Sequence, residues 1–222
     1  MSDLVLLLQR LSQLATAPLL GVLLISILVV AVIRNWRLAL PVMIAQYVVV
    51  GIMLARVAQP AVALIKLLAG VLVCLTLSIA AQRADDLRAK RGELVAAERV
   101  RNPSWRVMPS QVLLRAVATA LMLTAAFGAA TRFPLPKLAP DFTLAAYALI
   151  ASALLVIATA PEALNHGLGL LMFLSGIELI AVPLESSVSV AVLLGFMTLG
   201  LGVALSYITL ADVADPPLAE AT

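Results

Sequence analysis

Long apolar runs, each close to the length of one membrane crossing, most limit how this chain can fold. The hydrocarbon core of a bilayer is crossed by about 20 residues of helix, with a range near 17 to 25. Seven runs approach that length: residues 18–33, 38–55, 61–81, 112–131, 142–160, 167–184 and 188–210. A segment in lipid must satisfy its backbone hydrogen bonds internally, so each run is predicted to be helical. We therefore expect an all-α, polytopic integral membrane protein with about seven transmembrane helices.

The overall composition agrees with this expectation. Of the 222 residues, 63% are hydrophobic and 12% are charged, and the mean hydropathy is +1.11. Soluble domains use roughly 45–50% apolar residues, so a soluble globular fold is excluded. The net charge of +3 is small and the basic residues lie mainly in connections, which argues against nucleic-acid binding. The single cysteine, Cys74, excludes an intramolecular disulfide and a cysteine-based metal or iron–sulfur site.

The connections between the runs define the organisation of the chain. Short connections such as "RNWR" and "PEALNH" predict antiparallel helical hairpins. Residues 82–111 carry interleaved acidic and basic residues, so they are predicted to continue the third helix into water. The predicted regions are an interfacial N-terminal segment (1–17), a three-helix unit (18–81), the charged segment (82–111), a linking span (112–131), a second three-helix unit (142–210) and an acidic tail (211–222).

Lysine and arginine are unevenly divided between the two sides of the predicted bundle. Nine lie on the side that carries residues 82–111, and four lie on the other side, at Arg10, Arg56, Arg132 and Lys137. By the positive-inside rule the richer side is cytoplasmic. The N-terminus is therefore predicted to lie outside and the C-terminus inside.

An offset of 125 residues relates several positions of the two three-helix units. Gly51 and Gly176 are separated by this offset, and so are Gly70 and Gly195. Two explanations stay open, an internal duplication and chance agreement in a very apolar chain. A duplication would give two parallel repeats, because the linking span lets both units begin on the same side.

Three charged residues fall within the predicted spans, namely Lys66, Arg115 and Glu178. Arg115 is near the cytoplasmic end of its helix, so its long side chain can return the guanidinium to the headgroups. Glu178 has a short side chain, and an ionised carboxylate at its depth costs several kcal/mol unless it is compensated. Lys66 lies at a similar depth in the same half of the membrane, so we expect the two residues to form an ion pair. Glu178 then either takes part in a proton path or charged axis, or only holds helices together.

Other polar side chains in the spans are candidate neighbours of this pair. Gln46, Tyr47 and Ser175 are expected to line a polar or water-bearing environment, or else to hydrogen-bond between packed helices. Thr198 has the same two possible roles, with helix packing favoured, and His166 is interpreted as a polar residue at a helix end. The sequence has no phosphate-binding loop, nucleophile triad, metal-ligand spacing or haem motif. We expect no catalytic residues, no metal site and no cofactor bound by this chain.

The stretch "LNHGLGLLMFLSGIELIAVPLESS" resembles the small three-helix subunit of complex I, called subunit K in bacteria, and the C subunit of Mrp-type sodium/proton antiporters. The stretch "IKLLAGVLVCLTLSIAAQR" is similar to the lysine-bearing helix of the hydrogenase-4 component E family. The resemblance covers residues 38–83 and 142–210. It implies that Glu178 matches the buried glutamate of the subunit-K helix and Lys66 the lysine of the component E helix. Residues 188–210 contain no acid, whereas the subunit-K pattern has a second glutamate there.

This resemblance implies a non-catalytic subunit of a redox-driven or antiporter-type pump for protons or sodium ions. Its partners would be antiporter-like and quinone-module membrane subunits and a peripheral redox arm, in a bacterial inner membrane. An alternative is a structural or assembly subunit of a respiratory or photosynthetic membrane complex. A third is a stand-alone small transporter, for which interrupted helices and a polar site near the midplane are expected.

Overall fold

The computed structural model describes residues 16–33, 35–58, 60–90, 109–136, 138–160, 162–185 and 188–214. Most of the predicted N-terminal interfacial segment, residues 91–108 of the charged segment and residues 215–222 of the acidic tail lie outside these ranges, as do Arg10 and Lys137. The orientation predicted from the lysine and arginine count stays a prediction, and "cytoplasmic" and "outer" are used below in that sense.

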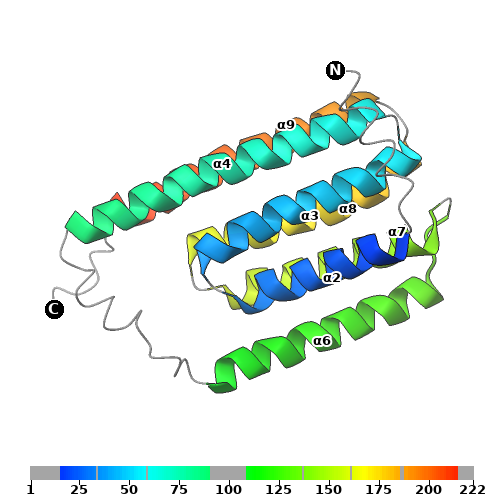
Figure 1. Cartoon of the computed structure of the whole chain (residues 1–222), viewed down its shortest axis with the longest axis horizontal. Helices are drawn as coiled ribbons and strands as arrows, with labels where there is room; N and C mark the ends of the chain where they lie inside the picture. Colours follow the sequence, from blue (N-terminus) through cyan, green and yellow to red (C-terminus); the bar gives the residue numbers. More distant parts are fainter. Residues whose placement is uncertain are drawn as a thin grey trace.

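Within these ranges, every regular element is an α-helix (Figure 1). The helices are α2 (Thr16–Val32), α3 (Trp36–Val57), α4 (Pro60–Lys90), α6 (Pro109–Arg132), α7 (Pro140–Thr159), α8 (Ala163–Leu184) and α9 (Val188–Ala214). Six of them are long and apolar enough to cross a membrane, and Pro18–Val32 in α2 forms a shorter apolar helix. The prediction of an all-α polytopic membrane protein is confirmed.

Three helices extend by four residues or more beyond the apolar runs that predicted them. Helix α4 continues from residue 81 to Lys90, α9 continues from residue 210 to Ala214, and α8 begins at Ala163 rather than at residue 167. Hydropathy marks only the part of a helix that suits lipid. Alanine, leucine, arginine and glutamine are all good helix formers in water, so a helix can continue past the end of its apolar run. The predicted extension of the third helix into polar sequence is therefore confirmed as far as Lys90.

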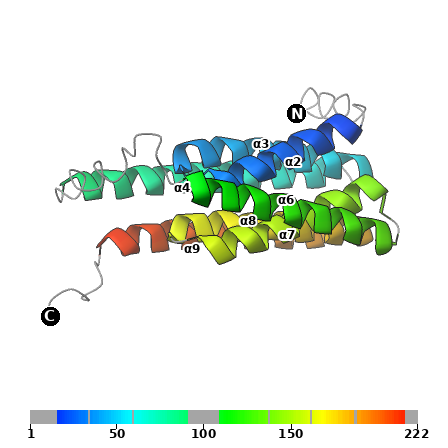
Figure 2. The same cartoon turned by 90° about the horizontal axis from the view of Figure 1, so that it is seen from below.

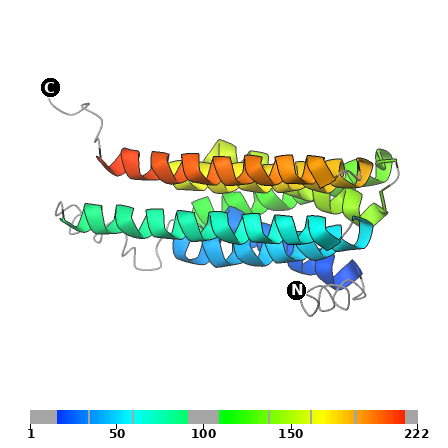
Figure 3. The same ribbon diagram turned by 90° about the horizontal axis from the view of Figure 1, so that it is seen from above.

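The helices are arranged in two layers of three, with α6 at one edge. One layer contains α2, α3 and α4, and the other contains α7, α8 and α9 (Figures 1 and 2). Helix α4 packs on α9, α3 on α8 and α2 on α7, while α6 packs against α7 and α2. Neighbours within a layer are antiparallel, whereas α4 and α9 run in the same direction and project past the other helices at the cytoplasmic end (Figure 3).

The two layers correspond to the two predicted three-helix units, but the glycines that suggested a repeat do not make equivalent contacts. A Cβ at Gly51 would face α4, the next helix along the chain, at Ala63 and Leu67. A Cβ at Gly176 would face α7, the preceding helix, at Ala146 and Ile150. The internal duplication stays a prediction.

Close backbone approach joins α7 and α8 in the second layer. A Cβ at Gly169 would lie 2.7 Å from Cγ1 of Ile157, 3.1 Å from its backbone nitrogen and 3.2 Å from the carbonyl oxygen of Ala153. Gly176, two turns further on, faces α7 in the same way. Small residues at such positions allow close van der Waals contact between helices. In lipid this contact drives helix association, because the hydrophobic effect does not favour helix–helix over helix–lipid contact.

We expect Gly169→Ala to destabilise the folded protein by roughly 1–3 kcal/mol, because the new methyl group meets backbone atoms of α7 that cannot rotate away. The free energy of unfolding, measured in mixed detergent micelles, is the readout. Gly200→Ala on α9 is the control, because a Cβ there meets no atom within 4 Å. Equal stability of the two variants would contradict close α7–α8 packing.

Candidate functional site

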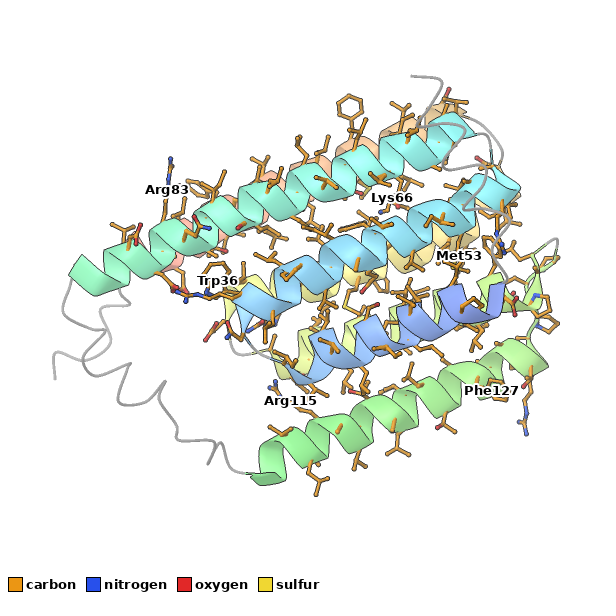
Figure 4. The ribbon with its side chains drawn as sticks, viewed as in Figure 1. Trp36, Met53, Lys66, Arg83, Arg115 and Phe127 are labelled. Atoms are coloured by element: carbon orange, nitrogen blue, oxygen red, sulfur yellow. The ribbon has the colours of Figure 1, made fainter. Side chains whose placement is uncertain are left out.

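Lys66 and Glu178 lie where four helices meet. Lys66 is six residues from the start of α4, and Glu178 is six residues from the end of α8. At 1.5 Å per residue, each is about 9 Å from the outer end of its helix. Helices α4 and α8 belong to different layers, and both of them contact α3 and α9. Figure 4 shows Lys66 on the inner side of α4, toward α3.

The predicted ion pair between these residues is confirmed. The ammonium Nζ of Lys66 contacts Oε2 of Glu178, and the two side chains are only 5% and 3% exposed. Both charges are therefore removed from water as well as from lipid. Such a pair gains stability only when its geometry is good and further hydrogen bonds satisfy the remaining polar atoms.

Hydroxyl groups on two helices supply those hydrogen bonds. The Thr198 hydroxyl of α9 lies 2.9 Å from both Oε1 of Glu178 and the carbonyl oxygen of Leu194, and donation of its one proton to Oε1 gives each carboxylate oxygen its own partner. Lys66 donates from Nζ to Oγ of Ser175, one turn before Glu178 on α8, at 3.3 Å. The Ser175 hydroxyl in turn donates to the carbonyl oxygen of Leu171 at 3.0 Å. The pair is thus enclosed by its own chain on both the acidic and the basic side.

Tyr47 of α3 forms the remaining contact with the ammonium. Nζ of Lys66 is 4.7 Å from the centroid of the Tyr47 ring, within the range of a cation–π interaction. Gln46, which precedes Tyr47 on α3, is equally buried, but its amide group has no hydrogen-bond partner among the described residues. The structure therefore brings Glu178, Lys66, Ser175 and Tyr47 together and does not connect Gln46 to them by a hydrogen bond.

From the sequence, Thr198 was expected to hydrogen-bond across helices or line a wet path, with packing as the favoured role, but it was not assigned to Glu178. Gly70 was noted only for its spacing from Gly195, although a Cβ there would lie 2.5 Å from Cγ of Tyr47. The hydroxyl of Thr198 within an apolar helix was the one available signal. Its contact with Glu178 depends on how α8 and α9 are rotated relative to each other, and local sequence does not specify this.

Arg115, the third charged residue in a predicted span, lies apart from this site. Its guanidinium donates to the carbonyl oxygen of Thr159 at 2.7 Å, at the cytoplasmic end of α7 (Figure 4). The last carbonyl groups of a helix have no partner within the helix, and a cation is favourable there. The prediction that the Arg115 head group turns to the membrane boundary agrees with this contact.

The arrangement suits the exchange or tuning of a buried charge. Within the described ranges, no group of three or more His, Cys, Asp or Glu residues could hold a metal ion. The residues gathered here instead provide one carboxylate, one ammonium, two hydroxyl groups and an aromatic ring. Buried ionisable groups in a membrane protein commonly mark ion pathways.

No protein-family model, no curated protein and no solved structure matches this chain. Its function is therefore argued from the geometry of the site together with the sequence resemblance.

Exchanging the two charges tests whether the ion pair stabilises the fold. Lys66→Glu and Glu178→Lys each bury two like charges, and we expect each to lower the free energy of unfolding by roughly 3–5 kcal/mol. The double exchange should restore roughly half of that loss, since the pair is re-formed in reverse. Arg37→Ala is the comparison, because the Arg37 side chain in its ion pair with Asp85 is 63% exposed and should contribute less than about 1 kcal/mol. A double exchange no better than either single change would count against the pair.

Replacing the Thr198 hydroxyl tests the hydrogen bond to the carboxylate. We expect Thr198→Val, which keeps the shape of the side chain, to cost roughly 0.6–1.7 kcal/mol of unfolding free energy. Thr124→Val is the matched control, because its hydroxyl bonds only to the Ala120 carbonyl oxygen of its own helix and is exposed. A cost no greater at position 198 than at position 124 would show that the carboxylate does not need this donor.

Proposed function

We propose that this chain is a non-catalytic membrane subunit of a multisubunit pump that moves protons or sodium ions and is redox-driven or of the antiporter type. Its role is to supply the Lys66–Glu178 pair to a charged axis that runs along the membrane plane. The observation that carries the proposal is the ion pair itself, which is fully buried at a depth where a bilayer makes charge costly. A merely structural contact between helices does not need ionised groups, because apolar side chains of similar size often stabilise at least as well.

The resemblance to subunit K, to the Mrp C subunit and to hydrogenase-4 component E supports the same role. Glu178 is then the exchanging carboxylate, Lys66 is the cation that tunes it, and Tyr47, Ser175 and Gln46 are polar neighbours. Redox chemistry belongs to partner subunits, with no cofactor on this chain. The membrane is a bacterial inner membrane, with the N-terminus outside and the C-terminus in the cytoplasm.

One observation favours the alternative of a structural or assembly subunit. The pair is satisfied entirely within the chain and connects α4 of one layer to α8 of the other. A contact of this kind fixes the position of one helix layer relative to the other, and it does so without the transport of any ion. The two functions differ in whether removal of the carboxylate charge affects transport or only assembly.

Identification of the partners is the first test. The tagged protein is extracted in mild detergent and separated on a native gel, and co-migrating proteins are identified by mass spectrometry. We expect co-migration with large multi-span subunits and a peripheral redox arm. Migration alone, or as a small homo-oligomer, would overturn the pump-subunit proposal and favour a stand-alone transporter.

Glu178→Gln then separates transport from assembly. We expect the complex to assemble and ion translocation to fall roughly 10²-fold, the lower end of what a positioned proton-transfer group contributes. Glu185→Gln is the matched control, because Glu185 is exposed at the C-terminal end of the same helix. A complex that carries this substitution should translocate ions at the normal rate. Normal translocation by the Glu178→Gln complex, or loss of assembly, would instead favour the structural role.

A further inference from the structure

The Lys66 ammonium contacts a carboxylate, a hydroxyl group and an aromatic ring, and of these three partners only the carboxylate can lose a negative charge. The carboxyl group of Glu178 is ionisable, and its Oε2 contacts the ammonium. The Tyr47 ring attracts a cation through its permanent quadrupole, and its centroid is 4.7 Å from Nζ. The ring is buried, as Tyr47 is 1% exposed. A cation–π interaction is strongest in such a desolvated position.

Helix α4 is shaped to admit this ring beside its own lysine. A Cβ at Gly70 would lie 2.5 Å from Cγ of Tyr47, 2.7 Å from Cδ1 and 2.9 Å from Cδ2. Any side chain at position 70 would therefore displace the ring. Gly70 follows Lys66 by four residues, one helical turn along the same face. The same face of α4 thus provides the cation and the space for the aromatic group that contacts it.

Of the groups that contact Lys66, the Tyr47 ring and the Ser175 hydroxyl do not change protonation state at neutral pH, whereas Glu178 can. Helix α8 contributes the Glu178 carboxylate and the Ser175 hydroxyl, and the Thr198 hydroxyl of α9 bonds to the carboxylate. Cys74, about two turns after Lys66 on α4 itself, is a buried free thiol. The Tyr47 hydroxyl has no hydrogen-bond partner among the described residues, so the ring face is the contact of Tyr47 with the site.

We propose that the Tyr47 ring is a positioning group that holds the Lys66 ammonium in place when Glu178 is neutral. A proton taken up by Glu178 forms an O–H bond on the carboxyl group and removes its negative charge, leaving the ammonium in a medium where an uncompensated cation is costly. The ring and the Ser175 hydroxyl then retain the cation until the proton leaves. The exchange of a proton at Glu178 rests on the proposed function, whereas the holding of Lys66 by the ring does not.

The test measures unfolding rates of the full chain in detergent micelles for Tyr47→Phe and Tyr47→Leu, each alone and combined with Glu178→Gln. The neutral amide imitates protonated Glu178. Combined with Glu178→Gln, Tyr47→Leu should unfold roughly 10- to 30-fold faster than Tyr47→Phe, because phenylalanine keeps the ring and leucine does not. With Glu178 intact, the two Tyr47 variants should differ less.

Lys66→Met separates the cation–π interaction from packing of the ring. Added to both double variants, it should reduce the difference between Tyr47→Phe and Tyr47→Leu, because no cation remains to be held. A difference that is unchanged by Lys66→Met would overturn the proposal and identify the ring as a packing residue. Equal increases in unfolding rate for Tyr47→Phe and Tyr47→Leu would also overturn the proposal, because loss of the hydroxyl, and not loss of the ring, would then explain the faster unfolding.

If Glu178→Gln with Tyr47→Leu yields no folded protein, the yield of folded protein after adding Lys66→Met becomes the readout. Recovery supports the proposal, since the uncompensated cation is then the cause of failure, and no recovery overturns it. Because these measurements concern unfolding, they are independent of translocation. The Glu178→Gln complex could translocate ions normally while Tyr47→Leu still unfolds faster than Tyr47→Phe in the Glu178→Gln background. That result would contradict the proposed function and still support the role of the ring in holding Lys66.

Discussion

An isolated charge inside a membrane has no water to solvate it, and in this chain Lys66 and Glu178 solve that problem for each other. Because one residue belongs to α4 and the other to α8, the two layers of the bundle must be placed so that these side chains meet. Helices α3 and α9, which contact both, close the site from the remaining sides. The relative position of the two layers is therefore tied to one ion pair.

The surroundings of the pair show how a bilayer-embedded ion pair is satisfied without a third charged group among the described residues. One oxygen meets the ammonium and the other accepts from Thr198. The ammonium contacts a carboxylate, a hydroxyl group and the face of an aromatic ring. This variety matters for the proposed function, because proton uptake by Glu178 would change the carboxylate contact and leave the other two unaltered. A site built from two fixed charges would have no comparable second state.

Small residues determine how closely the helices around this site can approach. Gly169 and Gly176 bring the backbones of α7 and α8 together, and Gly70 lets the Tyr47 ring lie against α4. These glycines serve different ends, since the first two allow a helix to touch a helix and the third allows a side chain to touch a helix. Elsewhere the outward faces carry large apolar residues such as Leu68, Phe127 and Phe196, which suits contact with lipid or with partner helices.

The sequence alone predicted the helical class and the approximate positions of these helices, six of which are long and apolar enough to cross a membrane, because hydropathy over about 20 residues is a local property. It also placed Lys66 and Glu178 at one depth, since distance along a helix follows directly from residue count. The ends of α4, α8 and α9 were less well predicted, because helices continue where lipid no longer requires them. Only the tertiary structure decided that Thr198 and the Tyr47 ring reach the pair and that the Gln46 amide does not hydrogen-bond to it. Successive residues point about 100° apart on a helix, so rotation of the packed helices, rather than depth, selects which side chains meet.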